Sequence, residues 1–186
     1  MYEHLTETTL HQQTLYEGLI VNVRRDEALL PDGSPCVREV VEHPGGVCAA
    51  ALTDEGELLF VRQFRYPHGE VLLELPAGKL EPGEPPLPAA QRELAEETGA
   101  AAACWEDLGL FYPTPGYCGE TLYLFFATEL TFSEPHPDAG EFLQCERIPL
   151  EKAVQMVLDN EIPDGKTQAA VLKAAKKAAA KNFSFH

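Results

Sequence analysis

The sequence predicts an α+β fold: a mixed, mostly antiparallel sheet with helices on its faces and a small antiparallel β extension at the N-terminus. Short β-branched runs separated by glycine- and proline-containing turns fill much of residues 15–75 and recur between residues 105 and 148. One helix pattern interrupts these runs, and two more helices are expected after residue 149. With 186 residues, the chain is long enough for one medium domain or a domain with a small extra lobe.

The N-terminal segment is expected to contain a β hairpin. We expect the first 15 residues to be weakly ordered. Leu15–Arg24 is β-branched and partly alternating, and Cys36–His43 has a similar pattern. Residues 31–35, with the sequence PDGSP, are typical of a turn between the two strands.

A glycine-rich break follows this hairpin and predicts a boundary. Pro44-Gly45-Gly46 divides an N-terminal segment, residues 1–45, from a main domain, residues 46–186. The main domain should contain a further hairpin, more single strands and three helices. The expected strands are Val47–Thr53, Glu57–Gln63, Leu72–Leu75, Trp105–Tyr112, Thr121–Glu129 and Phe142–Ile148; the expected helices are Pro86–Thr98, Leu150–Asn160 and Lys166–Asn182.

The helix Pro86–Thr98 has clear start and stop signals. Pro86 and Pro88 fall in its first turn, where backbone N–H groups have no helical partner. Gly99 follows as a C-terminal cap. The last helix, rich in alanine and lysine, suggests either a nucleic-acid or membrane surface or a solvated face whose lysines suit the helix dipole; we favour the solvated face.

Composition excludes several classes of function. The net charge is −16, with 30 acidic against 14 basic residues, which argues against nucleic-acid binding. No apolar run approaches the roughly 20 residues of a membrane span, and the polar N-terminus is not typical of a signal peptide. The five cysteines are scattered without a CxxC pair, which indicates reduced thiols in a cytoplasmic protein, and the dispersed histidines argue against a zinc site.

Three carboxylates share one surface of the helix Pro86–Thr98. Glu93, Glu96 and Glu97 have the spacing i, i+3, i+4, so their side chains are neighbours. Like charges at this spacing repel, and the helix dipole disfavours negative charge late in a helix. A divalent cation reverses that repulsion, since Mg²⁺ prefers carboxylate and phosphate oxygens. The alternative is an ordinary glutamate-rich solvated surface.

The spacing of the whole segment Gly78–Ala100 favours the metal site. Nine constrained positions across its 23 residues follow the Nudix box pattern, with Ala100 a weak version of the usual aliphatic residue. The constrained residues are Gly78, Glu84, Arg92, Glu93, Leu94, Glu96, Glu97, Gly99 and Ala100. The chain therefore resembles the Nudix hydrolases, and this resemblance implies an α/β/α sandwich of mixed sheet.

Further motifs resemble the ADP-ribose pyrophosphatase branch of that superfamily. These are FVRQFR at residues 60–65, LELPAG at 73–78 and TPG at 114–116, with Pro115 sixteen residues after Gly99. The resemblance implies hydrolysis of ADP-ribose to AMP and ribose 5-phosphate with two or three Mg²⁺ ions, for which Mn²⁺ can substitute. The box handles only the diphosphate, so another nucleotide sugar or a dinucleotide is an alternative substrate, and a non-catalytic ADP-ribose sensor is an alternative function.

The resemblance also assigns roles around the metal. It implies that the Ala77 carbonyl, Glu93, Glu96 and Glu97 hold the ions, with Gly78 allowing close approach of the backbone. Arg92 would orient a box glutamate, and Glu84 would support it. Glu120, after the TPG turn, is a candidate extra ligand.

Substrate and base are assigned outside the box. The resemblance implies that Arg65 contacts the diphosphate, with Glu81 nearby; the alternative is ordinary strand-end charge, which we prefer for Arg62. Glu39 and Ile20 are expected to contact adenine.

We predict Glu141, in an acidic loop, as the catalytic base; the alternative is a box glutamate such as Glu97. In this branch the N-terminal strands are commonly exchanged between subunits, so we expect a homodimer, with a small-molecule nucleotide substrate and with neither nucleic acid nor membrane as a partner.

Overall fold

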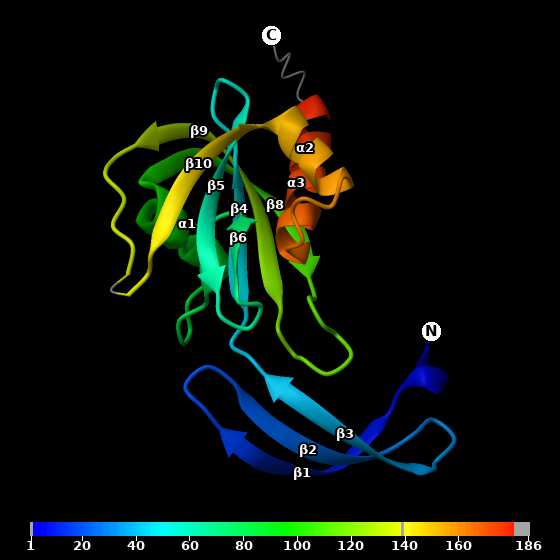
Figure 1. Cartoon of the computed structure of the whole chain (residues 1–186). Helices are drawn as coiled ribbons and strands as arrows, with labels where there is room; N and C mark the ends of the chain where they lie inside the picture. Colours follow the sequence, from blue (N-terminus) through cyan, green and yellow to red (C-terminus); the bar gives the residue numbers. More distant parts are fainter. Residues whose placement is uncertain (1, 139, 181–186) are drawn as a thin grey trace. The chain divides into compact units, whose positions relative to one another are not determined.

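The structure, a computed structural model, describes residues 2–138 and 140–180 (Figure 1). The chain forms two compact units. The first consists of Met1–Gly45 and Tyr112–Thr121, and the second of Gly46–Phe111 and Leu122–His186. The segment Tyr112–Thr121 thus belongs to the same unit as the N-terminal strands, although it is distant from them in sequence.

The first unit is built on a three-stranded antiparallel sheet in the order β1-β2-β3. A 3-10 turn, η1 (Glu3–Leu5), precedes the strands β1 (Thr8–Glu17), β2 (Asn22–Leu29) and β3 (Pro35–Glu42). Val41 in β3 ties the second segment to this sheet. Its N–H donates to the Tyr117 carbonyl at 2.8 Å, and its carbonyl accepts the Gly119 N–H at 2.9 Å.

Two predictions for this unit are wrong. The segment before Leu15 is not weakly ordered as far as it is described, because most of β1 lies within it, and Leu15–Arg24 is not one strand. The chain reverses direction there, with the Gly18 N–H donating to the Val21 carbonyl at 3.1 Å. All ten residues of β1 are exposed, so its sequence lacks the alternation of apolar and polar residues from which strands are predicted.

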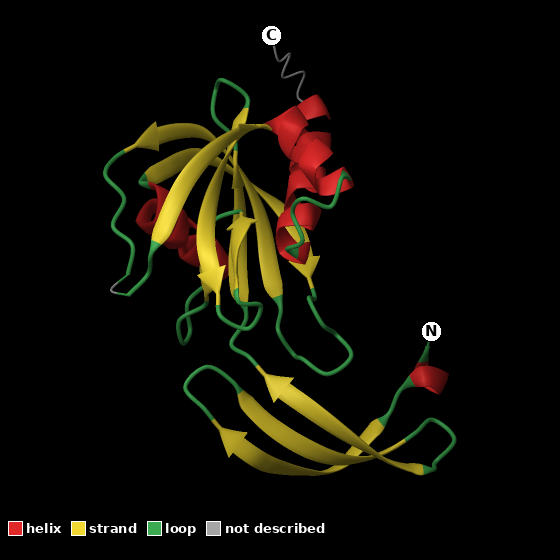
Figure 2. Ribbon diagram, in the orientation of Figure 1, coloured by secondary structure: helices red, strands yellow, loops and turns green. Residues whose placement is uncertain are grey.

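The described residues of the second unit form two sheets and three α-helices. Figure 2 shows these helices in red and the strands in yellow. One sheet has the order β10-β5-β6; the other has the order β7-β4-β9-β8, in which β4 and β9 run parallel. The strands are β4 (Gly46–Ala51), β5 (Glu57–Arg65), β6 (Glu70–Glu74), β7 (Ala77–Lys79), β8 (Ala100–Phe111), β9 (Leu122–Phe132) and β10 (Leu143–Pro149); the helices are α1 (Pro86–Thr98), α2 (Leu150–Leu158) and α3 (Gly165–Ala180).

Helices cover both faces of the sheets in the second unit. Cys48 and Ala50 in β4 pack in the largest core cluster, to which α2 and α3 contribute. The alternate residues Val47 and Ala51 pack in clusters with residues of α1. Successive side chains of a strand point to opposite faces, so α1 and α3 lie on opposite sides of β4 (Figure 1). The predicted α+β sandwich with a mixed sheet is confirmed.

Local signals predicted some bounds better than others. Helix α1 has the predicted bounds, and its cap Gly99 is left-handed with φ 70°. Strand β8 begins at Ala100, five residues before the predicted Trp105. The alanines there are weak strand formers, and they are in the strand because they pair with β9. Strand β7 was not predicted. The predicted end of the last helix, Asn182, lies outside the described residues. None of the helices in the described part is long and apolar enough to cross a membrane.

Candidate functional site

Helix α1 presents its three carboxylates beside a firmly packed apolar face. Ala89, Ala90 and Leu94 are at most 1% exposed and fix the rotation of the helix. Glu97 follows Leu94 by three residues and is only 3% exposed, whereas Glu93 and Glu96 are partly exposed. The packing that fixes the helix therefore buries a charged side chain, which needs compensation from its surroundings.

Arg92 holds the surrounding carboxylates together. Its Nη1 donates to Glu93 Oε1 and to Glu96 Oε2, both at 2.9 Å. Its Nε and Nη2 donate to the two oxygens of Glu84 at 3.0 and 2.9 Å. The hydrogen bonds to Glu84 are the largest cause of the raised pKa of Arg92, which is fully charged. The residues assigned as ligand, support and orienting group are thus in direct contact.

Glu97 is the most perturbed carboxylate of the group. The Ala77 N–H donates to its Oε2 at 3.0 Å. Burial nevertheless raises the pKa of Glu97 to about 8, and the negative charges of Glu93 and Glu141 add to this effect. Burial likewise raises the pKa of Glu93, against the opposing effect of Arg92. The negative charge on this part of the helix therefore exceeds the positive charge of Arg92.

The donor set fits a hard divalent cation. As the side chains stand, no group of three or more His, Cys, Asp or Glu side chains among the described residues converges on one point. Glu93 and Glu96 bond Arg92, and Glu97 bonds the Ala77 amide. Three carboxylates on one helix beside a backbone segment are nevertheless the oxygen donors that Mg²⁺ prefers, and a bound cation would lower the raised pKa values.

Gly78 adjoins this carboxylate group closely. A Cβ built on Gly78 would lie 1.9 Å from Oε1 of Glu93, far inside van der Waals contact. Any larger residue would displace the Glu93 carboxylate. Glycine at this position therefore leaves room for the Glu93 carboxylate beside strand β7.

Arg65 lies at the end of β5 and is held by a residue that the sequence did not single out. Its Nε and Nη2 donate to the two oxygens of Glu74 at 2.6 and 2.7 Å. Glu74 is only 1% exposed and also bonds Lys166. The one available signal was a glutamate within an apolar strand, LLEL, since a buried charge requires a partner.

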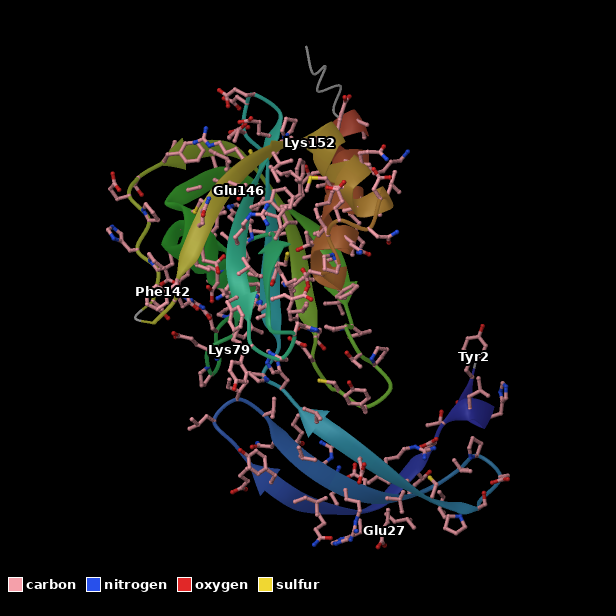
Figure 3. The ribbon with its side chains drawn as sticks, viewed as in Figure 1. Tyr2, Glu27, Lys79, Phe142, Glu146 and Lys152 are labelled. Carbon is pink, nitrogen blue, oxygen red and sulfur yellow. The ribbon has the colours of Figure 1, made fainter. Side chains whose placement is uncertain are left out.

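Arg62, for which we preferred a structural role, makes a comparable pair. Its Nε donates to Glu146 Oε1 at 2.5 Å and its Nη2 donates to Glu146 Oε2 at 3.3 Å, which joins β5 to β10. Glu146 is labelled on β10 in Figure 3. The strand thus carries two Arg–Glu pairs, of which that of Arg65 is the more buried.

The loop candidates lie around the same helix. Glu81 is exposed, and its N–H donates to Glu84 Oε2 at 3.0 Å. Glu141 is exposed, and its charge contributes to the pKa shifts of Glu93 and Glu97. The loop before Glu141 is tied to the helix where the His136 N–H donates to the Glu96 carbonyl at 2.9 Å.

Three predicted residues belong to the first unit. Ile20 is 56% exposed in the turn between β1 and β2, and Glu39 is exposed on β3. Glu120 lies in the second segment of the unit, with its Oε1 3.5 Å from Nδ1 of His43. The remaining predicted residues all lie in the second unit.

Comparison with known proteins agrees with this architecture. A NUDIX domain matches residues 42–171, and a nucleoside diphosphate sugar hydrolase N-terminal domain matches residues 7–41. An ADP-ribose pyrophosphatase of Bacillus subtilis (strain 168) is 38% identical over 90% of this chain and 91% of its own length. A methanol dehydrogenase activator of Bacillus methanolicus is 37% identical over 89% of this chain and 90% of its own.

A solved structure supports the fold independently. The crystal structure of an ADP compounds hydrolase aligns with a TM-score of 0.84, covering 96% of this chain and 97% of that one at 21% identity. The chain belongs to the NUDIX family of hydrolases, which confirms the resemblance seen in the sequence.

Proposed function

We propose that this chain hydrolyses ADP-ribose to AMP and ribose 5-phosphate in a Mg²⁺-dependent reaction. The observation that carries the proposal is the buried Glu97, held beside Glu93 on a helix whose negative charge exceeds what Arg92 offsets. Similarity to an ADP-ribose pyrophosphatase over 90% of the chain supports the choice of substrate.

Residues of α1 and β7 would bind the metal ions. Glu93, Glu96, Glu97 and the Ala77 carbonyl would hold two or three Mg²⁺ ions, with Mn²⁺ able to substitute. When bound, these ions polarise the diphosphate and lower the pKa of an attacking water. Arg92 keeps Glu93 and Glu96 oriented through its two 2.9 Å hydrogen bonds.

Residues outside the box bind the substrate and move the proton. Arg65 grips the diphosphate, with Glu81 beside it. Glu141 takes a proton from the attacking water. The water oxygen bonds to phosphorus while the bridging P–O bond of the diphosphate breaks. The negative charge of Glu141 contributes to the raised pKa values of Glu93 and Glu97, which supports a place for Glu141 near the reacting water. Glu84 supports Arg92, and Gly78 keeps the backbone close.

Residues of the first unit also have proposed roles. In this proposal Ile20 packs on adenine, Glu39 accepts its hydrogen bonds, and Glu120 is a further ligand. The exposed strands of residues 1–45 pair two copies into a homodimer, while residues 46–186 form the hydrolase domain. The free cysteines support a cytoplasmic location. Strong negative charge argues against nucleic acid and membranes as partners.

A substrate panel tests the proposal. The pure protein is incubated with Mg²⁺ and ADP-ribose, nucleotide sugars, dinucleotides or nucleoside diphosphates, and kcat/KM is measured for each. ADP-ribose is expected to rank among the best substrates, with AMP and ribose 5-phosphate as products. If a nucleotide sugar or a dinucleotide has a clearly higher kcat/KM than ADP-ribose, the proposed substrate is wrong and the proposed type of reaction stands. Tight binding of ADP-ribose without cleavage in Mg²⁺ or Mn²⁺ would indicate a sensor instead.

A further inference from the structure

Glu74 is a buried carboxylate with no place in the mechanism described above. It lies at the end of β6, three residues before Ala77, and its side chain is 2% exposed. Arg65 donates to both of its oxygens at 2.6 and 2.7 Å, and Lys166 bonds Oε2. A buried carboxylate with two cationic partners is a fixed point in the structure, because moving it would leave a charge unpaired.

Helix α3 holds the other partner of Glu74 in place. Asp164 precedes the helix, and its Oδ2 accepts the Thr167 N–H at 3.0 Å as an N-cap. The same oxygen accepts a hydrogen bond from Lys166 Nζ at 2.9 Å. The Thr167 hydroxyl in turn accepts the Leu75 N–H at 3.0 Å. The start of α3 thus fixes both the side chain of Glu74 and the backbone that follows it.

Glu74 remains ionised throughout the neutral range. Burial alone would raise its pKa, but the hydrogen bonds and charges of Arg65 and Lys166 outweigh burial and lower the pKa to about 2. The contact with Arg65 is therefore charge-assisted and bidentate, which fixes the plane of the guanidinium group.

We propose that Glu74 is a positioning residue that aims Arg65 at the diphosphate. The inference rests on the proposed role of Arg65. A guanidinium has five N–H donors, and Glu74 occupies one on Nε and one on Nη2, so three remain for a substrate. The Arg65 side chain is 36% exposed, whereas that of Glu74 is 2% exposed, so only the arginine is open to a ligand. The positive charge of Arg65 also acts to lower the pKa of Glu97.

The same strand offers a matched control. Arg62 and Glu146 also form a bidentate pair, with bonds of 2.5 and 3.3 Å, but Arg62 has no assigned role in binding. Glu146→Gln therefore removes a comparable carboxylate charge from β5's other Arg–Glu pair. A purely structural role of Glu74 predicts that Glu74→Gln and Glu146→Gln differ in stability but not in substrate affinity.

The test compares these variants in two assays. Calorimetry measures the Kd of the α,β-methylene analogue of ADP-ribose in Mg²⁺, and steady-state kinetics measures kcat and KM for ADP-ribose. Glu74→Gln should raise Kd and KM by about tenfold or more with a smaller change in kcat, because a ground-state contact is loosened, while Glu146→Gln stays within about twofold. Arg65→Lys with Glu74→Gln should lose little more affinity than Arg65→Lys alone.

Each outcome decides the inference. Equal Kd for Glu74→Gln and wild type, or additive losses in the double variant, would overturn it, as would a wild type that does not bind the analogue. A wild type that binds the analogue without cleaving ADP-ribose refutes the proposed function but still allows the Kd comparison. If Glu74→Gln does not fold, Glu74→Asp keeps the charge and should fold with an intermediate rise in Kd; an unchanged Kd for Glu74→Asp would then count against the inference.

Discussion

Replacing Glu97 by glutamine should stabilise the metal-free protein at alkaline pH. Burial holds the pKa of Glu97 at about 8 in the folded state, against the ordinary value of 4.5. Between these values the folded state binds a proton that the unfolded state does not, so the free energy of unfolding falls as pH rises through that window. Glutamine cannot ionise, yet its side-chain oxygen still accepts the Ala77 N–H, so the variant avoids this loss.

The magnitude follows from the width of the window. At about 1.36 kcal/mol per pH unit, the shift of Glu97 corresponds to at most about 5 kcal/mol between pH 4.5 and pH 8. Glu97 interacts with neighbouring charged groups, and we expect about half of that figure to be measured. A chain of this size gains roughly 2–4 °C in Tm per kcal/mol. The Tm of Glu97→Gln minus that of wild type should therefore be on the order of 5–10 °C larger at pH 8.5 than at pH 5.

Thermal unfolding followed by circular dichroism, in EDTA between pH 5 and pH 9, measures this difference. Glu96→Gln is the matched control, because Glu96 is on the same helix but partly exposed, and its Tm should follow that of wild type. In Mg²⁺ the Glu97→Gln variant should lose activity by orders of magnitude, a trade of stability against function. A Tm difference between Glu97→Gln and wild type that is the same at pH 5 and pH 8.5 would refute the reasoning.

Three further variants test the rest of the site. Gly78→Ala should cost about 1–3 kcal/mol and at least about tenfold in kcat, because the new Cβ displaces Glu93; urea unfolding and kinetics measure both. Arg92→Lys should lower kcat about 10–100-fold with little loss of helicity, since lysine cannot bridge Glu84 and Glu93 together; an unchanged kcat would contradict the orienting role. Glu141→Gln should lower kcat by about 10²–10⁴ at unchanged Tm, and a flat result would favour a box glutamate as the base.

The helix that carries the carboxylates was predictable because its signals are local. Two prolines mark its first turn and a left-handed Gly99 its end, and the spacing of Glu93 and Glu97 fixes their common surface. Strand β1 had no comparable signal. It is exposed along its whole length and is held by pairing with β2, so neither apolar alternation nor buried residues marked it in the sequence.

The network around Arg65 was not predictable for a different reason. Glu74 and Lys166 are 92 residues apart, and their contact depends on the tertiary fold, which brings the start of α3 to the end of β6. A charged residue in an apolar strand indicates that some partner exists, but it does not identify the partner. Asp164 was likewise missed, because its capping role is visible only once the first residue of α3 is known.

Relatives with differently named roles align with this chain over nearly its whole length, and the proposed division of the site would account for this. One is an ADP-ribose pyrophosphatase and another is a methanol dehydrogenase activator. In the proposed mechanism, Arg65 and the metal ions held by the α1 carboxylates would meet only the diphosphate, which every nucleoside diphosphate compound shares. Discrimination between such compounds must therefore come from groups that contact the base and the sugar, and Ile20 and Glu39 belong to the first unit rather than to the unit that holds the box.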